Sequence, residues 1–363
     1  METQPSTRQR ISNAAQWSLR RLGRFRIRLI LVTVVAVAAL GIGAGFAFAR
    51  SSTPTIGTGV VVVNTKLAYQ GGAAAGTGIV LTSSGEVLTN NHVIQGETSV
   101  QVVVPGTTRT YSGRVVGYDV SADVAVIQLS GASNLKTASL GDSSKVTAGQ
   151  AVKAVGNAGG TGTLTSATGT VTGLGKSITV SNDQGGTEQL AGMIETNAAL
   201  QPGDSGGPLL TSSGKVIGMD TAASTSFGFR AAAASDSYAI PINTATTLAK
   251  QIESGRATAV VHVGSTAFMG VQIASTLGNG GFGGPTSAGA VIAGTVAGGP
   301  AASAGLTAGD VITAINSQSV SSPPTITSLI LTKKPGAKIT VTYTDQSGAS
   351  HVTTVTLASG PPQ

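Results

Sequence analysis

The stretch QPGDSGGPL, from Gln201 to Leu209, places one serine among three glycines and two prolines. Glycine supplies 51 of the 363 residues, yet a GDSGG core would arise by chance only on the order of once in several hundred such chains. A serine hydroxyl attacks a carbonyl group only when a base removes its proton. Ser205 is therefore a candidate nucleophile, and its base must lie elsewhere in the chain.

Histidine is the base best suited to neutral pH, and the chain contains three histidines. His92 lies in TNNHVI, after the strand-like EVLT, where a loop could direct it into a cleft. Taken alone, such a histidine is more often structural than catalytic. His262 and His351 lie outside the β-rich part of the chain, and we interpret them as surface residues.

A catalytic serine and histidine need a buried carboxylate that fixes the tautomer of the imidazole. Asp123 opens the run DVAVIQL, where an acidic group before a buried strand is costly without a partner. The alternative role for Asp123 is a turn residue, and Asp119 in GYDVSAD is a second candidate that we interpret as solvated. We find no cluster of metal ligands and no GxxxxGK[ST] motif, so neither a metal nor a cofactor is expected.

Short β-branched runs separated by turn residues extend from Gly57 to about Tyr238, and they predict an all-β barrel or sandwich. The runs are GVVVV, GIVLT, VQVVV, VAVIQL, AVKAVG and KVIGM. GIVLTSSGEVLTN indicates a hairpin that turns at Ser83-Ser84-Gly85. The absence of cysteine excludes disulfides and thiol chemistry, so stability must come from packed cores.

A different pattern begins near the end of this region. The spacing of apolar residues predicts a helix from Asn243 to Ser254, capped by Asn243 and ended by Gly255. RATAVVHVGST then resembles an extended connector. The residues from about Phe268 to Ser359 combine strands with helices expected at Pro300–Ala304 and Ile326–Thr332, which is an α+β pattern.

The positive charge of the chain is concentrated at its N-terminus. Residues 1–28 carry seven arginines against Glu2, which accounts for six of the seven net charges and makes nucleic-acid binding a poor interpretation. The next 21 residues, Leu29–Ala49, are uncharged and long enough as a helix to cross a bilayer, with the N-terminus cytoplasmic. A signal peptide cleaved after Ala47-Phe48-Ala49 is the alternative. We favour a retained anchor because the apolar run exceeds that of a usual signal peptide.

The ordered motifs resemble the HtrA (Deg) branch of the chymotrypsin-like proteases, which share the chain order His, Asp, Ser. The matching stretches are GTGIVLTSSGEVLTNNHVI, DVAVIQL, AVGNAGG, ETNAALQPGDSGGPL, VIGM and SYAIPI, and they span most of residues 57–250. VNTKLAYQ, TAFMGV and the closing GPP are most similar to exported mycobacterial members with one PDZ module. The resemblance implies two six-stranded β-barrels with His92, Asp123 and Ser205 in the cleft between them.

The C-terminal module resembles a bacterial PDZ domain through AFMGVQI and AASAGLTAGDVITAINSQSV. Its turn Phe268-Met269-Gly270-Val271 is expected to present backbone N–H groups to the carboxylate of a peptide that adds as a β-strand. The rest of the groove is expected to be lined by Ile326, Leu329 and Ile330. The alternative is that FMGV is only a packed strand.

The glycines around Ser205 have an explanation in this family. They allow the N–H groups of Gly203 and Ser205 to converge, with that of Asp204 beside them, as an oxyanion hole. Many HtrA members have asparagine at the position of Asp204. In trypsin-like enzymes an aspartate there receives a new N-terminal ammonium group, but this sequence has no RIVGG-type activation site. The partner of Asp204 is left open.

By the same resemblance, Ala199 forms the floor of the primary specificity pocket, and Leu200 and the segment Met219-Asp220-Thr221, Thr221 included, line its walls. A floor without aspartate argues against selection of lysine or arginine. We therefore expect cleavage after small or medium apolar residues.

The fold class expected is an all-β, chymotrypsin-like double β-barrel followed by an α+β PDZ domain and preceded by one transmembrane helix. The expected boundaries are a basic cytoplasmic segment at 1–28, the anchor at 29–49, linkers at 50–56 and 256–266, the protease domain at 57–255 and the PDZ domain at 267–359. The protein is expected to be a single-pass protein of the cell membrane with both domains extracytoplasmic, unless cleavage releases them.

The expected function is a serine endopeptidase that cleaves unfolded or damaged exported proteins, with a PDZ domain that binds substrate C-termini and regulates activity. The alternative is a chaperone or peptide-binding scaffold with little or no proteolysis. HtrA relatives are often trimers, so the resemblance leaves a homotrimer open.

Overall fold

The structure is a computed structural model that describes residues 57–181, 187–221, 237–274 and 289–362. The anchor expected at 29–49 lies outside these residues. Among the helices that the structure does describe, none is long and apolar enough to cross a membrane.

Strands dominate the described residues, as the sequence predicts. The helices are α1 (Asn91–Ile94), α2 (Ile242–Glu253), α3 (Pro300–Ser303) and α4 (Pro323–Leu331). The first strands are β1 (Val60–Leu67), β2 (Gly72–Val80), β3 (Glu86–Thr89), β4 (Ser99–Val103), β5 (Thr110–Asp119) and β6 (Val124–Leu129). The next are β7 (Ala151–Gly156), β8 (Thr165–Ser181), β9 (Thr187–Thr196), β10 (Pro208–Thr211), β11 (Val216–Thr221), β12 (Ser237–Pro241) and β13 (Val261–Val263). The last are β14 (Thr266–Phe268), β15 (Val271–Ile273), β16 (Ala290–Thr295), β17 (Val311–Ile315), β18 (Gln318–Ser319), β19 (Lys338–Thr344), β20 (Ser350–Thr356) and β21 (Ala358–Gly360).

The first barrel is formed by β1 to β6. Its strands follow the order β5-β4-β1-β2-β3-β6, and β6 pairs again with β5, which closes the ring. The hairpin between β2 and β3 turns where the sequence predicts, because Gly85 adopts φ +96° and donates its N–H to the Thr82 carbonyl. The connector expected at 256–266 also contributes to this sheet, since β13 pairs with β5.

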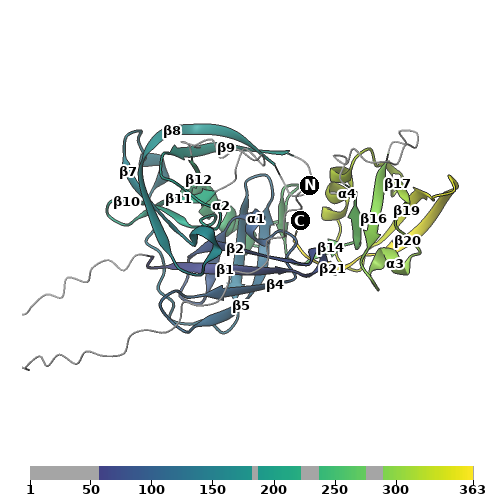
Figure 1. Ribbon diagram of the computed structural model, residues 1–363, viewed down its shortest axis with the longest axis horizontal. Helices are drawn as coiled ribbons and strands as arrows, with labels where there is room; N and C mark the ends of the chain where they lie inside the picture. The colour runs from purple at the N-terminus through teal and green to yellow at the C-terminus, as the bar shows by residue number, and fades with distance from the viewer. Residues whose placement is uncertain (1–56, 182–186, 222–236, 275–288, 363) are drawn as a thin grey trace, which may run out of the picture. The chain divides into compact units, whose positions relative to one another are not determined.

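The second barrel is closed and has the strand order β10-β11-β12-β9-β8-β7 (Figure 1). Helix α2 packs against strands of both barrels and buries Ile242, Ala245, Ala249 and Ile252. The sequence predicted this apolar face, but the predicted start is wrong by one residue: the helix begins at Ile242 and has no side-chain cap. A core of residues from both barrels and α2 therefore fixes the base of the site described below.

The C-terminal module has its own core and the predicted α+β composition. Its main sheet has the order β15-β16-β17-β19-β20, with β18 paired to β17, and β14 pairs separately with β21. Helices α3 and α4 begin at prolines, which are tolerated in the first turn because the N–H they lack would have no partner there. Ala301, Ile326 and Ile330 join the helices to the strand core.

Candidate active site

His92 lies on α1, a single helical turn that follows β3. The flanking Asn90 and Asn91 are buried, whereas the His92 side chain is 40% exposed. Asn90 donates from Nδ2 to the Asp123 carbonyl oxygen at 3.0 Å. The buried asparagine thus ties the turn that carries the imidazole to the start of β6.

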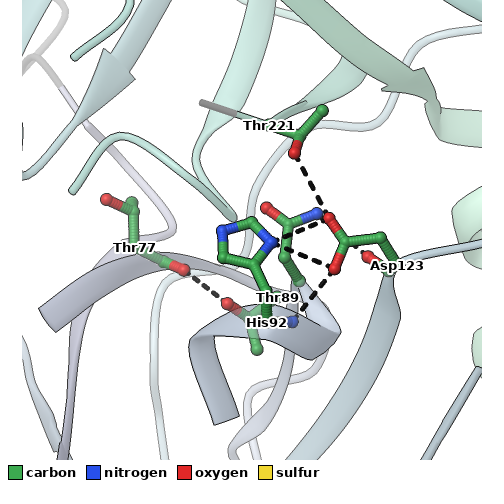
Figure 2. A network of polar contacts seen from close by, with 6 residues as sticks. Thr77, Thr89, His92, Asp123 and Thr221 are labelled. Atoms are coloured by element: carbon green, nitrogen blue, oxygen red, sulfur yellow. Dashed lines mark hydrogen bonds and ion pairs between the residues drawn. The ribbon is translucent and has the colours of Figure 1, made fainter. Parts of the chain in front are cut away.

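Asp123 meets His92 through its carboxylate. The Nδ1 atom of His92 lies 2.9 Å from Oδ2 and 3.1 Å from Oδ1, and the His92 backbone N–H donates to Oδ1 at 3.0 Å (Figure 2). Asp123 has φ +53°, a left-handed conformation that aspartate tolerates better than most residues. The Asp123 N–H closes a turn on the Val120 carbonyl at 3.2 Å, and this turn brings the carboxylate to the His92 ring.

A third donor reaches the same carboxylate from the second barrel. The Thr221 hydroxyl donates to Oδ2 of Asp123 at 3.2 Å across 98 residues of sequence. Figure 2 shows Thr221 and His92 approaching the carboxylate from different directions, and it shows the second ring nitrogen of His92 pointing away from Asp123. Asp123 is therefore buried and fully engaged as an acceptor.

Ser205 lies in a turn between the second barrel and β2. Gly203 and Gly206 adopt φ +98° and +83°, so glycine on each side permits the turn, as predicted. The Ser205 carbonyl accepts from the Thr77 N–H at 2.8 Å, and the Thr77 hydroxyl donates to the Gly203 carbonyl at 2.7 Å. These bonds fix the turn on β2.

The same turn packs against the residue that ends β3, directly before the asparagines and α1. A Cβ atom on Gly206 would collide with the Thr77 carbonyl oxygen and with Oγ1 of Thr89. Thr89 in turn donates to the Thr77 carbonyl at 2.7 Å (Figure 2). The Ser205 turn and the start of α1 therefore share one hydrogen-bonded support, which requires glycine at position 206.

The predicted oxyanion residues differ in their backbone bonding. The Asp204 N–H donates to the Gln201 carbonyl at 3.0 Å, so this amide is engaged within the turn and is not available as the third donor that the sequence suggested. Gly203 and Ser205 are the other two donors of that prediction. Ser205 and Asp204 are both 5% exposed.

The predicted pocket residues do not share one environment. Ala199 is exposed, and Leu200 is half-buried against the core of the second barrel. Thr221 is buried against Asp123, a contact that sequence reasoning missed. Residues 222–236, which follow it, lie outside the described part of the chain. A threonine at the end of a buried strand was the only available signal for the Asp123 contact.

Asp119 and the two other histidines have neighbours outside the His92–Asp123 contact. Asp119 is 3% exposed, so the expectation of a solvated side chain is wrong, and its carboxylate accepts from the Ser121 hydroxyl and the Ala122 N–H of its own turn. His262 is half-buried beside the Tyr118 ring and is not the surface residue expected, and burial lowers its pKa. His351 is exposed and pairs with Asp345 at 2.7 Å.

The predicted PDZ residues line a cavity along β15 and α4. Gly270 adopts φ +78° between β14 and β15, as a carboxylate-binding turn would require. The lining includes Phe268, Met269, Gly270, Val271, Ile326 and Ile330. Leu329, which the sequence also suggested for the groove, packs on the core of the module.

Comparison with known proteins gives matches in both the two-barrel region and the C-terminal module. Residues 76–219 match the family model described as a trypsin-like peptidase domain, and residues 267–355 match the PDZ domain model. The chain is 35% identical over 312 residues to "Serine protease PepD" of Mycobacterium tuberculosis, an alignment that covers 82% of this chain and 63% of that protein. It is 32% identical over 266 residues to "Periplasmic pH-dependent serine endoprotease DegQ" of Escherichia coli, covering 73% of this chain and 55% of the relative.

Solved structures also match. One of them, "HtrA-type protease AlgW with tripeptide", is 29% identical, with a TM-score of 0.47, and the match covers 84% of this chain and 95% of that one.

Proposed function

Because the chain belongs to the HtrA family of serine proteases, in which a trypsin-like peptidase domain is combined with a PDZ domain, we propose that it is a serine endopeptidase. His92, Asp123 and Ser205 are its catalytic residues. The observation that supports this best is the 2.9 Å contact between His92 Nδ1 and the buried Asp123 carboxylate. A carboxylate held this way is what a general-base histidine needs.

The roles of the three side chains follow from that contact. Asp123 accepts a hydrogen bond from Nδ1–H, so the lone pair of the imidazole lies on Nε2, where it can take the Ser205 proton. Ser205 attacks the scissile carbonyl and forms an acyl-enzyme, and His92 returns the proton to the leaving amine. Water then repeats the sequence and releases the acid. The buried Asp123 anion stabilises the imidazolium that forms in each half.

The oxyanion of each tetrahedral intermediate is stabilised by the backbone N–H groups of Gly203 and Ser205. Each such donor contributes about 10² to 10³ in kcat where it has been tested by removal. The glycine conformations at 203 and 206 support this role, because they allow the main chain to curl around the nucleophile.

The substrates, the role of the PDZ domain and the location that we propose follow from the family resemblance and from the sequence. Substrates are unfolded or damaged exported proteins, cleaved after small or medium apolar residues. The PDZ cavity binds peptide C-termini and regulates cleavage, which its apolar lining supports. Both domains are extracytoplasmic, which the periplasmic location of the DegQ relative supports. They are held to the cell membrane by Leu29–Ala49, an uncharged run long enough to span a bilayer as a helix.

Cleavage of casein or a denatured model protein by the full chain tests the proposal. The Ser205→Ala variant should lose about 10⁶ in kcat, because the nucleophile is gone, and it should keep PDZ binding of an apolar C-terminal peptide. Ser212→Ala, at an exposed serine of the next hairpin, is the matched control and should cleave normally. Equal behaviour of wild type and Ser205→Ala, with aggregation suppressed by both, would favour a chaperone or scaffold.

A further inference from the structure

Two carboxyl groups flank the glycines of the Ser205 turn. Asp204 directly precedes Ser205. Asp220, on β11, donates its N–H to the Gly207 carbonyl at 2.7 Å, and its own carbonyl accepts from the Gly206 N–H at 2.9 Å. The backbone of Asp220 is thus bonded to both residues that follow the nucleophile.

Neither carboxyl group is satisfied in its surroundings. Asp220 is 0% exposed, and both of its carboxyl oxygens are without a hydrogen-bond partner among the described residues. Asp204 accepts from the Gln201 N–H through Oδ2 at 2.9 Å, but its buried Oδ1 has no partner there. Since a buried, unpaired carboxylate costs several kcal/mol, two such groups beside the same turn are a state that the fold should avoid.

Strand geometry separates Asp220 from the catalytic carboxylate. Thr221 points to Asp123, and successive side chains of a strand point to opposite faces, so Asp220 faces away from the His92–Asp123 contact. Its register partner on β12 is Ala239, which is buried and offers no side-chain donor. Asp220 therefore has no route to the donors that satisfy Asp123.

No other titratable group on the elements packed against β11 and the turn is hydrogen-bonded to either carboxyl group in the described residues. These groups are Lys153, Glu195, Tyr238, Lys250 and Glu253. The Tyr238 hydroxyl and Lys176 both contact Glu195, Lys250 and Glu253 are exposed on α2, and β10 has no titratable residue. Burial raises the pKa of Asp220 well above 3.8, and the neighbouring charge of Asp204 raises it further. Burial also raises the pKa of Asp204, although the Gln201 N–H opposes the shift.

We propose that Asp204 and Asp220 share a single proton at neutral pH and act together as positioning residues that hold the Ser205 turn. The proton removes one of the two buried charges, which lowers the cost of burying the pair. Loss of that proton leaves two buried anions beside the turn, and their repulsion displaces the turn from Thr77. The positioning role rests on the proposed peptidase function, whereas the shared proton does not.

The shared proton is tested by stability in the inactive Ser205→Ala background, measured by urea unfolding across pH. Asp220 ionises with its ordinary pKa of 3.8 when unfolded and with a higher one when native, so the native state loses stability as pH rises above 3.8. Asparagine does not titrate. Asp220→Asn should therefore raise the urea midpoint, by an amount that grows with pH up to the native pKa and then stays constant. Each unit of pKa difference gives a tenfold change in the unfolding constant.

Asp310→Asn is the matched control for this measurement. Asp310 is also buried, at 3% exposed, but its carboxylate accepts from the N–H and the hydroxyl of Thr307. Its replacement should lower the urea midpoint, because a bonded anion is lost. If Asp220→Asn lowers the midpoint at neutral pH as well, Asp220 is a stabilising anion in the native state, and the proposal is overturned.

The positioning role is tested by the pH dependence of kcat/KM. Wild type should rise as the imidazole deprotonates and fall at higher pH when the pair loses its proton. Asp220→Asn should keep the rise and lack the fall, with the change expressed in kcat. Asp204→Asn gives a second variant with the same expected profile, in case the first folds poorly. An alkaline fall that is unchanged in both variants would overturn the positioning role, whereas a wild type without cleavage would defeat the peptidase function and leave the stability result standing.

Discussion

Asp123 and Asp220 are both buried aspartates next to Thr221, and they meet opposite surroundings. On the His92 side of the site, the Asp123 carboxylate accepts from the His92 ring, the His92 N–H and the Thr221 hydroxyl. On the Ser205 side, the Asp220 carboxyl accepts from no described residue. The two carboxyl groups are thus both buried, but one has three donors and the other has none among the described residues.

The backbone explains why these donors reach only Asp123. Asp123 begins β6 in a left-handed turn, which frees its side chain to face α1. Asp220 lies within β11 opposite Ala239, where the neighbouring main chain is already committed to the ladder and the Ser205 turn. An aspartate within a strand has few ways to acquire donors, so it stays neutral or destabilises the fold.

The largest expected effect is on the His92 side of the site, where the Asp123 carboxylate has its donors. Asp123→Asn keeps the shape of the side chain but presents an amide to Nδ1, which favours the wrong imidazole tautomer and should lower kcat by about 10⁴-fold. Asp119→Asn, whose parent carboxylate serves only its own turn, should change kcat far less. Steady-state kinetics on one peptide substrate compare the two variants. The reverse ranking would assign the third catalytic role to Asp119.

A smaller effect is expected on the His92 side when the Thr221 hydroxyl, the donor on β11, is removed. Thr221→Val removes the hydroxyl bound to Asp123 and keeps the volume, so it should lower kcat by about tenfold, the value of one hydrogen bond to a charged group. Thr221→Ser keeps the hydroxyl and should retain most of the activity. If valine and serine variants have equal kcat, the Thr221 contact does not support Asp123, and the two sides of the site differ less than their contacts indicate.

The sequence predicted the residues that chemistry requires and missed those that support them. His92, Asp123 and Ser205 could be selected by residue type and order, and the structure brings His92 and Asp123 into contact. The sequence placed Thr221 in a pocket wall by resemblance, because nothing local reveals a hydrogen bond formed across 98 residues. Asp220 was likewise assigned to a wall, since its lack of a partner is a property of the folded barrel.

The prediction of helix α2 shows that long-range contacts also limit what the sequence reveals about the fold. The mostly β peptidase domain was predicted from short β-branched runs and turn residues, which are local signals. The resemblance to the HtrA family supplied the barrels and the PDZ domain, and a closed barrel and both family matches are found. The cap assigned to Asn243 was wrong, because its Oδ1 atom accepts from the Ser143 N–H, 100 residues earlier, and the helix begins one residue sooner. A long-range partner therefore overrode a local preference.

Glu97 should show the smallest of these effects. It is an acidic residue on the His92 side of the site and has no side-chain partner among the described residues. It lies three residues beyond α1, and burial alone raises its pKa from 4.5 to about 7. The native state therefore loses stability as pH rises from 4.5 to about 7. The urea midpoint of Glu97→Gln should exceed that of wild type by an amount that grows over this pH interval and is constant above it. Because Glu97 is only half-buried, the gain should be smaller than that of Asp220→Asn. Glu253→Gln, at an exposed position on α2, should gain less still, and a larger gain there would show that burial does not set the order.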